Sequence, residues 1–207
     1  MSDFEKRMLL AQHCELRAVP AEEGGDQNAS PRIAGYGAVF NQRSDLLGGF
    51  FVELIAPGAF DDVLTQDVRG LFNHDPNYLL GRTVSGTLRL SVDQRGLAYE
   101  IDTPNTQTIR DLVVEPLKRG DMSGSSFAMR VAKGGDTWHE EDGVVVRTIY
   151  RIAELRDVGP VSFPAYPDSS AAQRSLDAWK QAKNEGLEGR AQFEREARER
   201  LLDLNDL

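Results

Sequence analysis

The stretch from Val84 to Ile101 constrains the fold most, because apolar and polar residues alternate along it on both sides of a turn sequence. The apolar positions would each line one face of a strand: Val84, Leu88, Leu90 and Val92 before the turn, and Leu97, Tyr99 and Ile101 after it. Between them, Asp93-Gln94-Arg95-Gly96 has the composition of a hairpin loop. The pattern predicts an antiparallel β-hairpin.

Other segments place this hairpin in a mainly β domain with peripheral helices, an α+β fold. Apolar and β-branched runs predict further strands in 8–19, 32–40, 48–55, 68–73, 125–131, 143–152 and 156–163. One helix is predicted for 58–66, after Pro57. A second would start at Asn105 or Thr106, end at Arg119-Gly120-Asp121 and be kinked or shortened by Pro116.

The composition changes after Asp168, which predicts a β domain over residues 1–168 and a charged helical extension over 169–207. The extension has no proline, and its apolar residues follow helical spacing in two stripes: Leu176 and Trp179, then Phe193, Ala197, Leu201 and Leu204. The second stripe suits docking to scaffold-like helices or self-association, packing back on the domain, or removal by self-cleavage.

Charge and composition argue against several classes of function. The net charge of the 207 residues is -9, and an acidic surface does not favour nucleic acid or anionic membranes. No apolar run approaches the roughly 20 residues of a membrane-spanning helix, and Met8-Leu9-Leu10-Ala11 is too short for the core of a signal peptide. The single cysteine, Cys14, excludes an internal disulfide and points to a reducing cytoplasm.

No metal or cofactor is expected. His13 and Cys14 are adjacent on a predicted strand and would point to opposite faces, so they could not chelate one ion together. His139 lies in a predicted polar loop among acidic residues. The chain contains no Cys-x-x-Cys, His-Glu-x-x-His, calcium-loop or glycine-rich phosphate-binding motif.

The chemistry that the sequence favours is serine hydrolysis. His74 follows a predicted strand, and Ser126 lies in another, so they are candidates for a base and its nucleophile. The alternatives are that Asn73-His74-Asp75-Pro76 is only a polar turn and that Ser123 or Ser125 takes the place of Ser126. Glu154 and Asp157, on the late strands, are the candidates for a third member that orients the imidazole.

Several short motifs occur in an order and spacing that resemble the prohead (capsid maturation) protease family of tailed bacteriophages. The resemblance covers roughly residues 30–168 and rests on Gly35–Asn41, Pro57–Phe60, Asn73–Pro76, Leu80–Thr83, Ser85–Leu90, Arg119–Asp121, Ser126-Phe127, Asp157-Val158 and Phe163–Pro167. Two departures are Gly159, where relatives commonly have serine, and Pro116, inside an expected helix. The family occurs in phages, prophages and gene-transfer agents.

The resemblance implies an antiparallel β-barrel of the herpesvirus assemblin type and a serine endopeptidase. It implies His74 as the base, Ser126 as the nucleophile and Asp157 as the third member. The implied partners are the major capsid protein precursor and scaffold, cut inside the assembling procapsid in the bacterial cytoplasm, together with the protease itself. A homodimer is expected by analogy with the herpesvirus enzymes.

Two other classes of function are weighed against the peptidase. The first is a non-enzymatic capsid-assembly or scaffold module on the same fold. The second is an esterase-type hydrolase, which the absence of a nucleophile-elbow motif disfavours.

Overall fold

The computed structural model describes residues 4–9, 11–19, 31–163, 172–186 and 188. The chain separates into two compact units, Met1–Ser169 and Ser170–Leu207. In the second unit, residues 172–186 form a helix. The apolar stripe predicted from Phe193 to Leu204 lies outside the described residues, so the functions suggested for it stay predictions.

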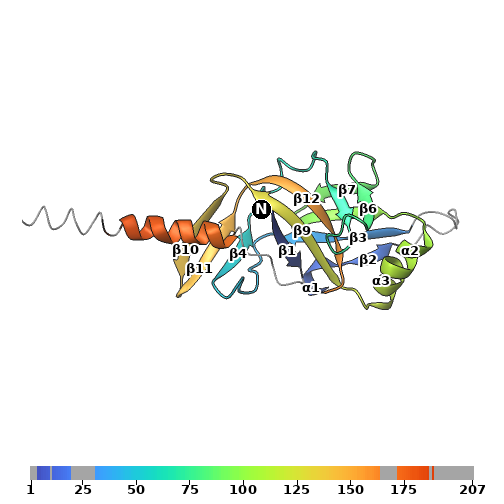
Figure 1. Ribbon diagram of the computed structural model, residues 1–207, viewed down its shortest axis with the longest axis horizontal. Coiled ribbons are helices and arrows are strands. Elements are labelled where there is room, and N and C mark those ends of the chain that lie inside the picture. The colour runs from blue at the N-terminus through green and yellow to red at the C-terminus, as the bar shows by residue number, and fades with distance from the viewer. Residues whose placement is uncertain (1–3, 10, 20–30, 164–171, 187, 189–207) are drawn as a thin grey trace, which may run out of the picture. The chain divides into compact units, whose positions relative to one another are not determined.

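The first unit is mainly β with few helices, as predicted (Figure 1). Its strands are β1 Glu5–Leu9, β2 Arg17–Val19, β3 Arg32–Val39, β4 Phe51–Ile55, β5 Arg69–Leu71, β6 Leu79–Arg82, β7 Leu88–Val92, β8 Gly96–Asp102, β9 Gly124–Val131, β10 Asp136–Glu141, β11 Val144–Ile149 and β12 Ile152–Val161. Its helical segments are α1 Ala11–Cys14, α2 Gln107–Ile109, the π-helix η1 Arg110–Val114 and α3 Glu115–Arg119.

The described strands form three sheets. Their orders are β1-β9-β12-β5-β6, β2-β3-β8-β7 and β10-β11-β4. Most neighbours are antiparallel, while β12 runs parallel to β5 and β11 runs parallel to β4. The predicted hairpin is β7 and β8, with Leu90 opposite Tyr99. In Figure 1, β1, β9 and β12 lie side by side, as their hydrogen-bonded order requires.

The five-stranded and four-stranded sheets pack face to face at two close contacts. A Cβ on Gly37 of β3 would come within 2.8 Å of Val158 Cγ2 on β12, and one on Gly70 of β5 within 2.8 Å of Ile101 Cδ1 on β8. A side chain at either position would therefore force its neighbour in the other sheet to shift, and glycine avoids this. Each of the three sheets ends in two edge strands, so the expected closed barrel is not found among the described strands.

Some local predictions were wrong for reasons that the backbone explains. The single strand expected over 8–19 is β1, α1 and β2 instead, and Glu15 between the last two has a left-handed φ of 45°. The helix expected over 58–66 is a series of turns with i to i+3 hydrogen bonds, entered through Gly58 at φ 87°. Strands β6 and β10 were not predicted, because both are rich in polar or turn-forming residues.

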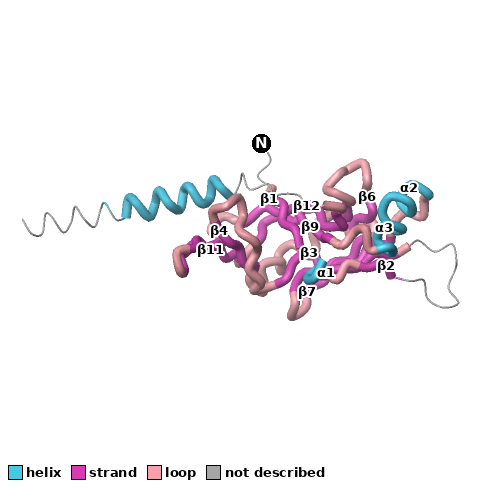
Figure 2. Tube along the Cα trace, turned by 90° about the horizontal axis from the view of Figure 1, so that it is seen from below, coloured by secondary structure: helices cyan, strands magenta, loops and turns pink. Residues whose placement is uncertain are grey.

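The second predicted helix is present, but it contains a π-helical turn. Thr106, and not Asn105, is its N-cap, with its hydroxyl accepting from the Ile109 N–H at 3.4 Å. The wider turn of η1 ends at Val114, two residues before Pro116, which lies in the first turn of α3, and Gly120 closes the helix at φ 80°. Proline is thus accommodated within a helical segment. Figure 2 shows α2 and α3 together, with α3 beside β2.

None of the helices described in the structure is long and apolar enough to cross a membrane.

Candidate active site

Ser126 lies in the five-stranded sheet on β9, between the edge strand β1 and the central strand β12. Its Cα partners are Met8 on one side and Gly159 on the other. Successive strand residues point to opposite faces, and Ser125 accordingly turns into the core, where its hydroxyl donates to the Tyr99 hydroxyl at 3.1 Å. Only Ser126 is hydrogen-bonded to His74, so the geometry distinguishes the two neighbouring serines.

His74 occupies a strained turn between β5 and β6. Asn73 and His74 both have left-handed backbones, with φ of 54° and 58°. Asp75 stabilises the turn, because its Oδ1 accepts from the Asn77 N–H at 2.8 Å. The interpretation of this motif as an Asx-type turn is therefore confirmed, and the same turn presents the imidazole to β9.

Asn73 fixes this turn to the end of β12. Its backbone N–H donates to the Pro160 carbonyl at 3.1 Å, and its side-chain oxygen accepts from the Ser162 N–H at 2.9 Å. Since β12 also carries Asp157, these bonds fix the position of the His74 turn relative to Asp157.

Asp157 is the acid that meets the histidine. Its carboxylate is 3% exposed and forms a short contact with His74 Nδ1. The other candidate, Glu154, is more exposed and pairs with Arg130 at 2.6 Å. An ionised carboxylate can only accept, so Nδ1 carries a proton, and in the neutral imidazole Nε2 is then the acceptor.

Ser126, His74 and Asp157 therefore form one hydrogen-bonded chain. The distance from His74 Nε2 to Ser126 Oγ is 2.6 Å, within the range of a nucleophile and its base. The histidine and aspartate side chains are 9% and 4% exposed. This arrangement, in which one carboxylate fixes the tautomer of an imidazole that contacts a hydroxyl, has the geometry of a Ser-His-Asp hydrolase site.

The family described as Caudovirus prohead serine protease matches residues 16–182. The chain belongs to this family. The matched residues include His74, Ser126 and Asp157, and the family is one of serine peptidases that act in capsid maturation. No curated protein and no solved structure gives a significant match. Strand β1 precedes the matched residues.

Gly159, one of the two departures noted in the sequence, lies where this structure leaves no room for a side chain. A Cβ at this position would lie 2.1 Å from the Leu71 carbonyl oxygen, which is backbone and cannot move aside without shifting β5. Gly159 also faces Ser126 across the strand pair. The absence of a side chain at Gly159 thus allows β12 and β5 to lie close together beside the candidate active site.

Ser126 has a second hydrogen-bond partner that the sequence did not indicate. The Ser126 hydroxyl donates to the backbone carbonyl of Arg7 at 2.8 Å. A serine hydroxyl has one proton, so a bond to this carbonyl competes with donation to His74 Nε2. No local motif signals the contact, because it depends on how β1 pairs with β9.

The remaining candidates of the sequence lie elsewhere. The Cys14 thiol is buried and donates to the Ser123 carbonyl at 2.9 Å, and burial raises the pKa of the Cys14 thiol above its ordinary value. The His13 ring lies beside the Gln12 amide at 3.0 Å. Among the described residues, no three His, Cys, Asp or Glu side chains are grouped to hold a metal.

Proposed function

We propose that the protein is a serine endopeptidase in which Ser126 is the nucleophile, His74 the general base and acid, and Asp157 the residue that orients the imidazole. The observation that carries this proposal is the hydrogen-bonded chain from Asp157 through His74 to Ser126 in a member of the prohead protease family. The nucleophile needs a base within hydrogen-bond reach, and the base needs an acid that orients it; Ser126 has His74, and His74 has Asp157.

In this mechanism, His74 Nε2 accepts the Ser126 proton as the oxygen attacks a peptide carbonyl carbon. The C–N bond of the tetrahedral intermediate then breaks, and the imidazolium gives its proton to the departing amine. Water, activated by the same imidazole, hydrolyses the acyl-enzyme and regenerates the serine. Asp157 holds the tautomer and stabilises the imidazolium, so its loss should cost less than the loss of Ser126.

The proposed substrates follow from the family. They are scaffold, or the scaffolding segment of the major capsid protein precursor, cleaved inside the assembling procapsid within the host bacterium. Self-cleavage and a homodimer belong to the same proposal. The oxyanion donors in this proposal are backbone N–H groups.

The deciding experiment is co-expression with the major capsid protein precursor, wild type against Ser126→Ala, followed by mass spectrometry of the product termini. New termini with the wild type alone are expected. A small serine-directed phosphonate should add one mass increment to the wild type and none to Ser126→Ala. Precursor cleavage that persists in Ser126→Ala would overturn the proposal.

The non-enzymatic assembly module is the alternative outcome of the same experiment. It would leave the precursor intact and Ser126 unlabelled, while the protein still entered procapsids. Sedimentation of the purified protein over a range of concentrations tests the homodimer separately.

A further inference from the structure

Strand β1 lies along the edge of the five-stranded sheet directly beside the nucleophile. It pairs antiparallel with β9 from Glu5 opposite Met129 to Leu9 opposite Ser125, with Met8 opposite Ser126. An extended peptide that binds a protease commonly adds a strand in this manner, with main-chain hydrogen bonds for affinity and pockets for alternate side chains. β1 therefore has the position and direction of a bound peptide.

The carbonyl of Arg7 is the backbone group that the nucleophile contacts. Ser126 Oγ lies 2.8 Å from this oxygen and 2.6 Å from His74 Nε2. While the hydroxyl donates to the carbonyl oxygen, its proton is not directed at His74, so the arrangement is a resting one. It nevertheless identifies Arg7 as the counterpart of the residue that precedes a scissile bond.

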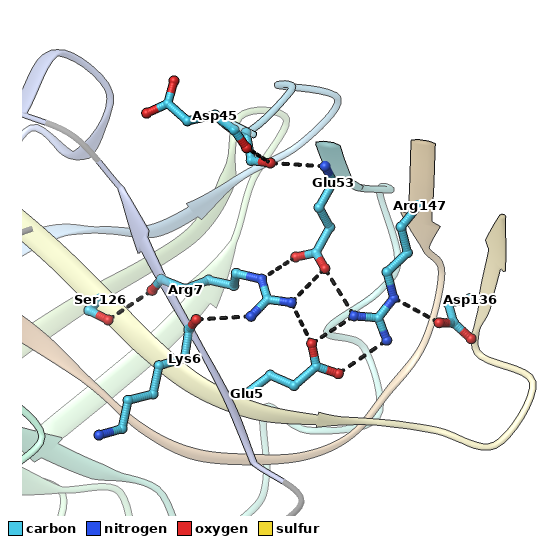
Figure 3. Close-up of polar contacts among 9 residues, drawn as sticks. Glu5, Lys6, Arg7, Asp45, Glu53, Ser126, Asp136 and Arg147 are labelled. Carbon is cyan, nitrogen blue, oxygen red and sulfur yellow. Dashed lines mark hydrogen bonds and ion pairs between the residues drawn. The ribbon is translucent and has the colours of Figure 1, made fainter. Parts of the chain in front are cut away.

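The side chain of this counterpart residue is held in a buried site. Arg7 Nε and Nη2 donate to the two carboxylate oxygens of Glu53, on β4, at 2.6 and 2.7 Å (Figure 3). The Arg7 and Glu53 side chains are 6% and 3% exposed. Two parallel bonds between a guanidinium and a carboxylate are a specific form of recognition.

A second charge on β1 is recognised two residues earlier. Glu5 shares a face of β1 with Arg7, and its carboxylate accepts from Arg147 Nη1 at 2.7 Å and from Nη2 at 3.1 Å (Figure 3). Arg147, on β11, also donates to Asp136 at 2.7 Å. The side chain of Lys6, between them, is exposed. The site thus binds three consecutive residues of β1 of which the first is acidic, the second is exposed and the third is basic.

The charges left behind when β1 moves away support this pattern. Glu53 and Asp136 carry -1 each and Arg147 carries +1, so the site without β1 has a formal charge of -1. Burial opposes the charged forms of Glu5 and Arg7, but their partners outweigh it: the pKa of Glu5 is lowered and the pKa of Arg7 is raised. With β1 in place the charges of Glu5 and Arg7 cancel and the cluster also sums to -1, so a substrate that brings one acidic and one basic side chain leaves the balance unchanged.

The site also has room beside the ion pair. A cavity of about 250 Å³ is lined by Arg7 and Glu53 together with Gly37, Arg43 and Phe127. The exchange of one basic side chain for another therefore does not require the sheets to separate.

We propose that the edge of β9 covered by β1 is the substrate-binding edge, and that β1 occupies it as an internal mimic of the substrate. Glu53 selects arginine or lysine immediately before the scissile bond, and Arg147 favours an acidic residue two positions earlier. The inference rests on the proposed function, since it names the substrates of the same site. Substrate replaces β1; Ser126 Oγ then bonds to the carbonyl carbon of the basic residue, and the departing amine takes the proton from His74.

The test is the rate at which peptide phosphonates label Ser126 in the full-length protein, read by intact mass. The probe is acetyl-Glu-Lys-Arg ending in a diphenyl phosphonate, and its matched partner carries citrulline, which has the shape of arginine without the charge. We expect the arginine probe to react on the order of 100-fold faster. Replacing its glutamate with glutamine should slow it by a smaller factor.

Substitution of Glu53 tests whether this residue is the source of the preference for arginine over citrulline. Glu53→Gln should reduce the arginine-to-citrulline ratio toward one, whereas Glu100→Gln, which alters half-buried ion pairs with Arg32 and Arg89, should leave the ratio unchanged. If Glu53→Gln does not fold, the probe series on the wild type still decides the matter.

Labelling with a small phosphonate that carries no peptide distinguishes failure of the proposed function from failure of the inference about β1. If it fails to label Ser126, the proposed function fails. If it labels Ser126 but the arginine probe has no advantage over citrulline, or neither peptide reacts, β1 is a permanent edge strand and the inference is overturned.

Discussion

The site of Ser126 and the cluster of Glu5, Arg7, Glu53 and Arg147 are both buried and polar, but they are built differently. The three residues of the first are placed by backbone: two central strands and a left-handed turn. The residues of the second lie on β1, β4 and β11 and are held by one another's charges.

This difference predicts how substitutions in each region affect activity and stability. Removing the Ser126 hydroxyl takes away a small polar group and leaves the strands intact, so activity should suffer and the fold should not. Removing one charge from the cluster leaves its partners buried without compensation, which is costly to stability. The two regions meet at Arg7, whose carbonyl contacts the nucleophile and whose side chain belongs to the cluster.

Ser126→Ala tests the first half of this comparison and should have the largest effect. Peptidase activity should fall by on the order of 10⁶-fold, the loss seen when the nucleophile of other serine proteases is removed. The midpoint of thermal unfolding should move little. A large loss of stability would show that the hydroxyl has a structural role and would remove the contrast between the two regions.

Asp157→Asn should lower kcat by about 10⁴-fold, because an asparagine can hold the imidazole in the wrong tautomer. The matched control is Glu154→Gln on the same strand, which alters only the exposed pair with Arg130. Steady-state kinetics on a peptide substrate compare the two. Equal effects would contradict the assignment of Asp157.

Glu53→Ala should destabilise the protein by about 3–5 kcal/mol, because Arg7 and Arg147 would be left buried without their shared carboxylate. Denaturant unfolding measures this. A change below 1 kcal/mol would mean that the cluster behaves like a surface ion pair.

Gly159→Ala should cost about 3 kcal/mol or more, since the added Cβ would lie 2.1 Å from the Leu71 carbonyl oxygen. The same change at Gly186, in the helix of the second unit, meets nothing within 4 Å and should be neutral or slightly stabilising. Denaturant unfolding of the two variants measures the difference in their stability losses. The two losses would be similar if β5 could shift freely.

Acid should weaken the cluster through Glu5, whose pKa is lowered. A carboxyl of this kind contributes stability that is fully present above its ordinary pKa of 4.5 and is lost as the pH falls through the lower folded value. Glu5→Gln should therefore cost about 1–2 kcal/mol at pH 7 and progressively less in acid. Thermal unfolding between pH 3 and 7 follows the difference, and a constant gap would contradict it.

The sequence by itself determined features that depend on neighbours in the chain. Alternation fixed the hairpin of β7 and β8, and the composition of Asn73-His74-Asp75-Pro76 fixed a turn. The family motifs chose Ser126 and Asp157 among nearby alternatives, and these two meet His74. The hairpin and the turn rest on side-chain periodicity and on local hydrogen bonds, which a few residues specify.

Only the tertiary structure decided the contacts between distant strands. The sequence could not show that Arg7 reaches Glu53, that Glu5 reaches Arg147, or that the Arg7 carbonyl meets Ser126, because these partners share no periodicity and lie 46 to 142 positions apart. The close approach of Gly159 to β5 has the same origin. Such contacts are set by strand order and register, which arise from packing the whole domain.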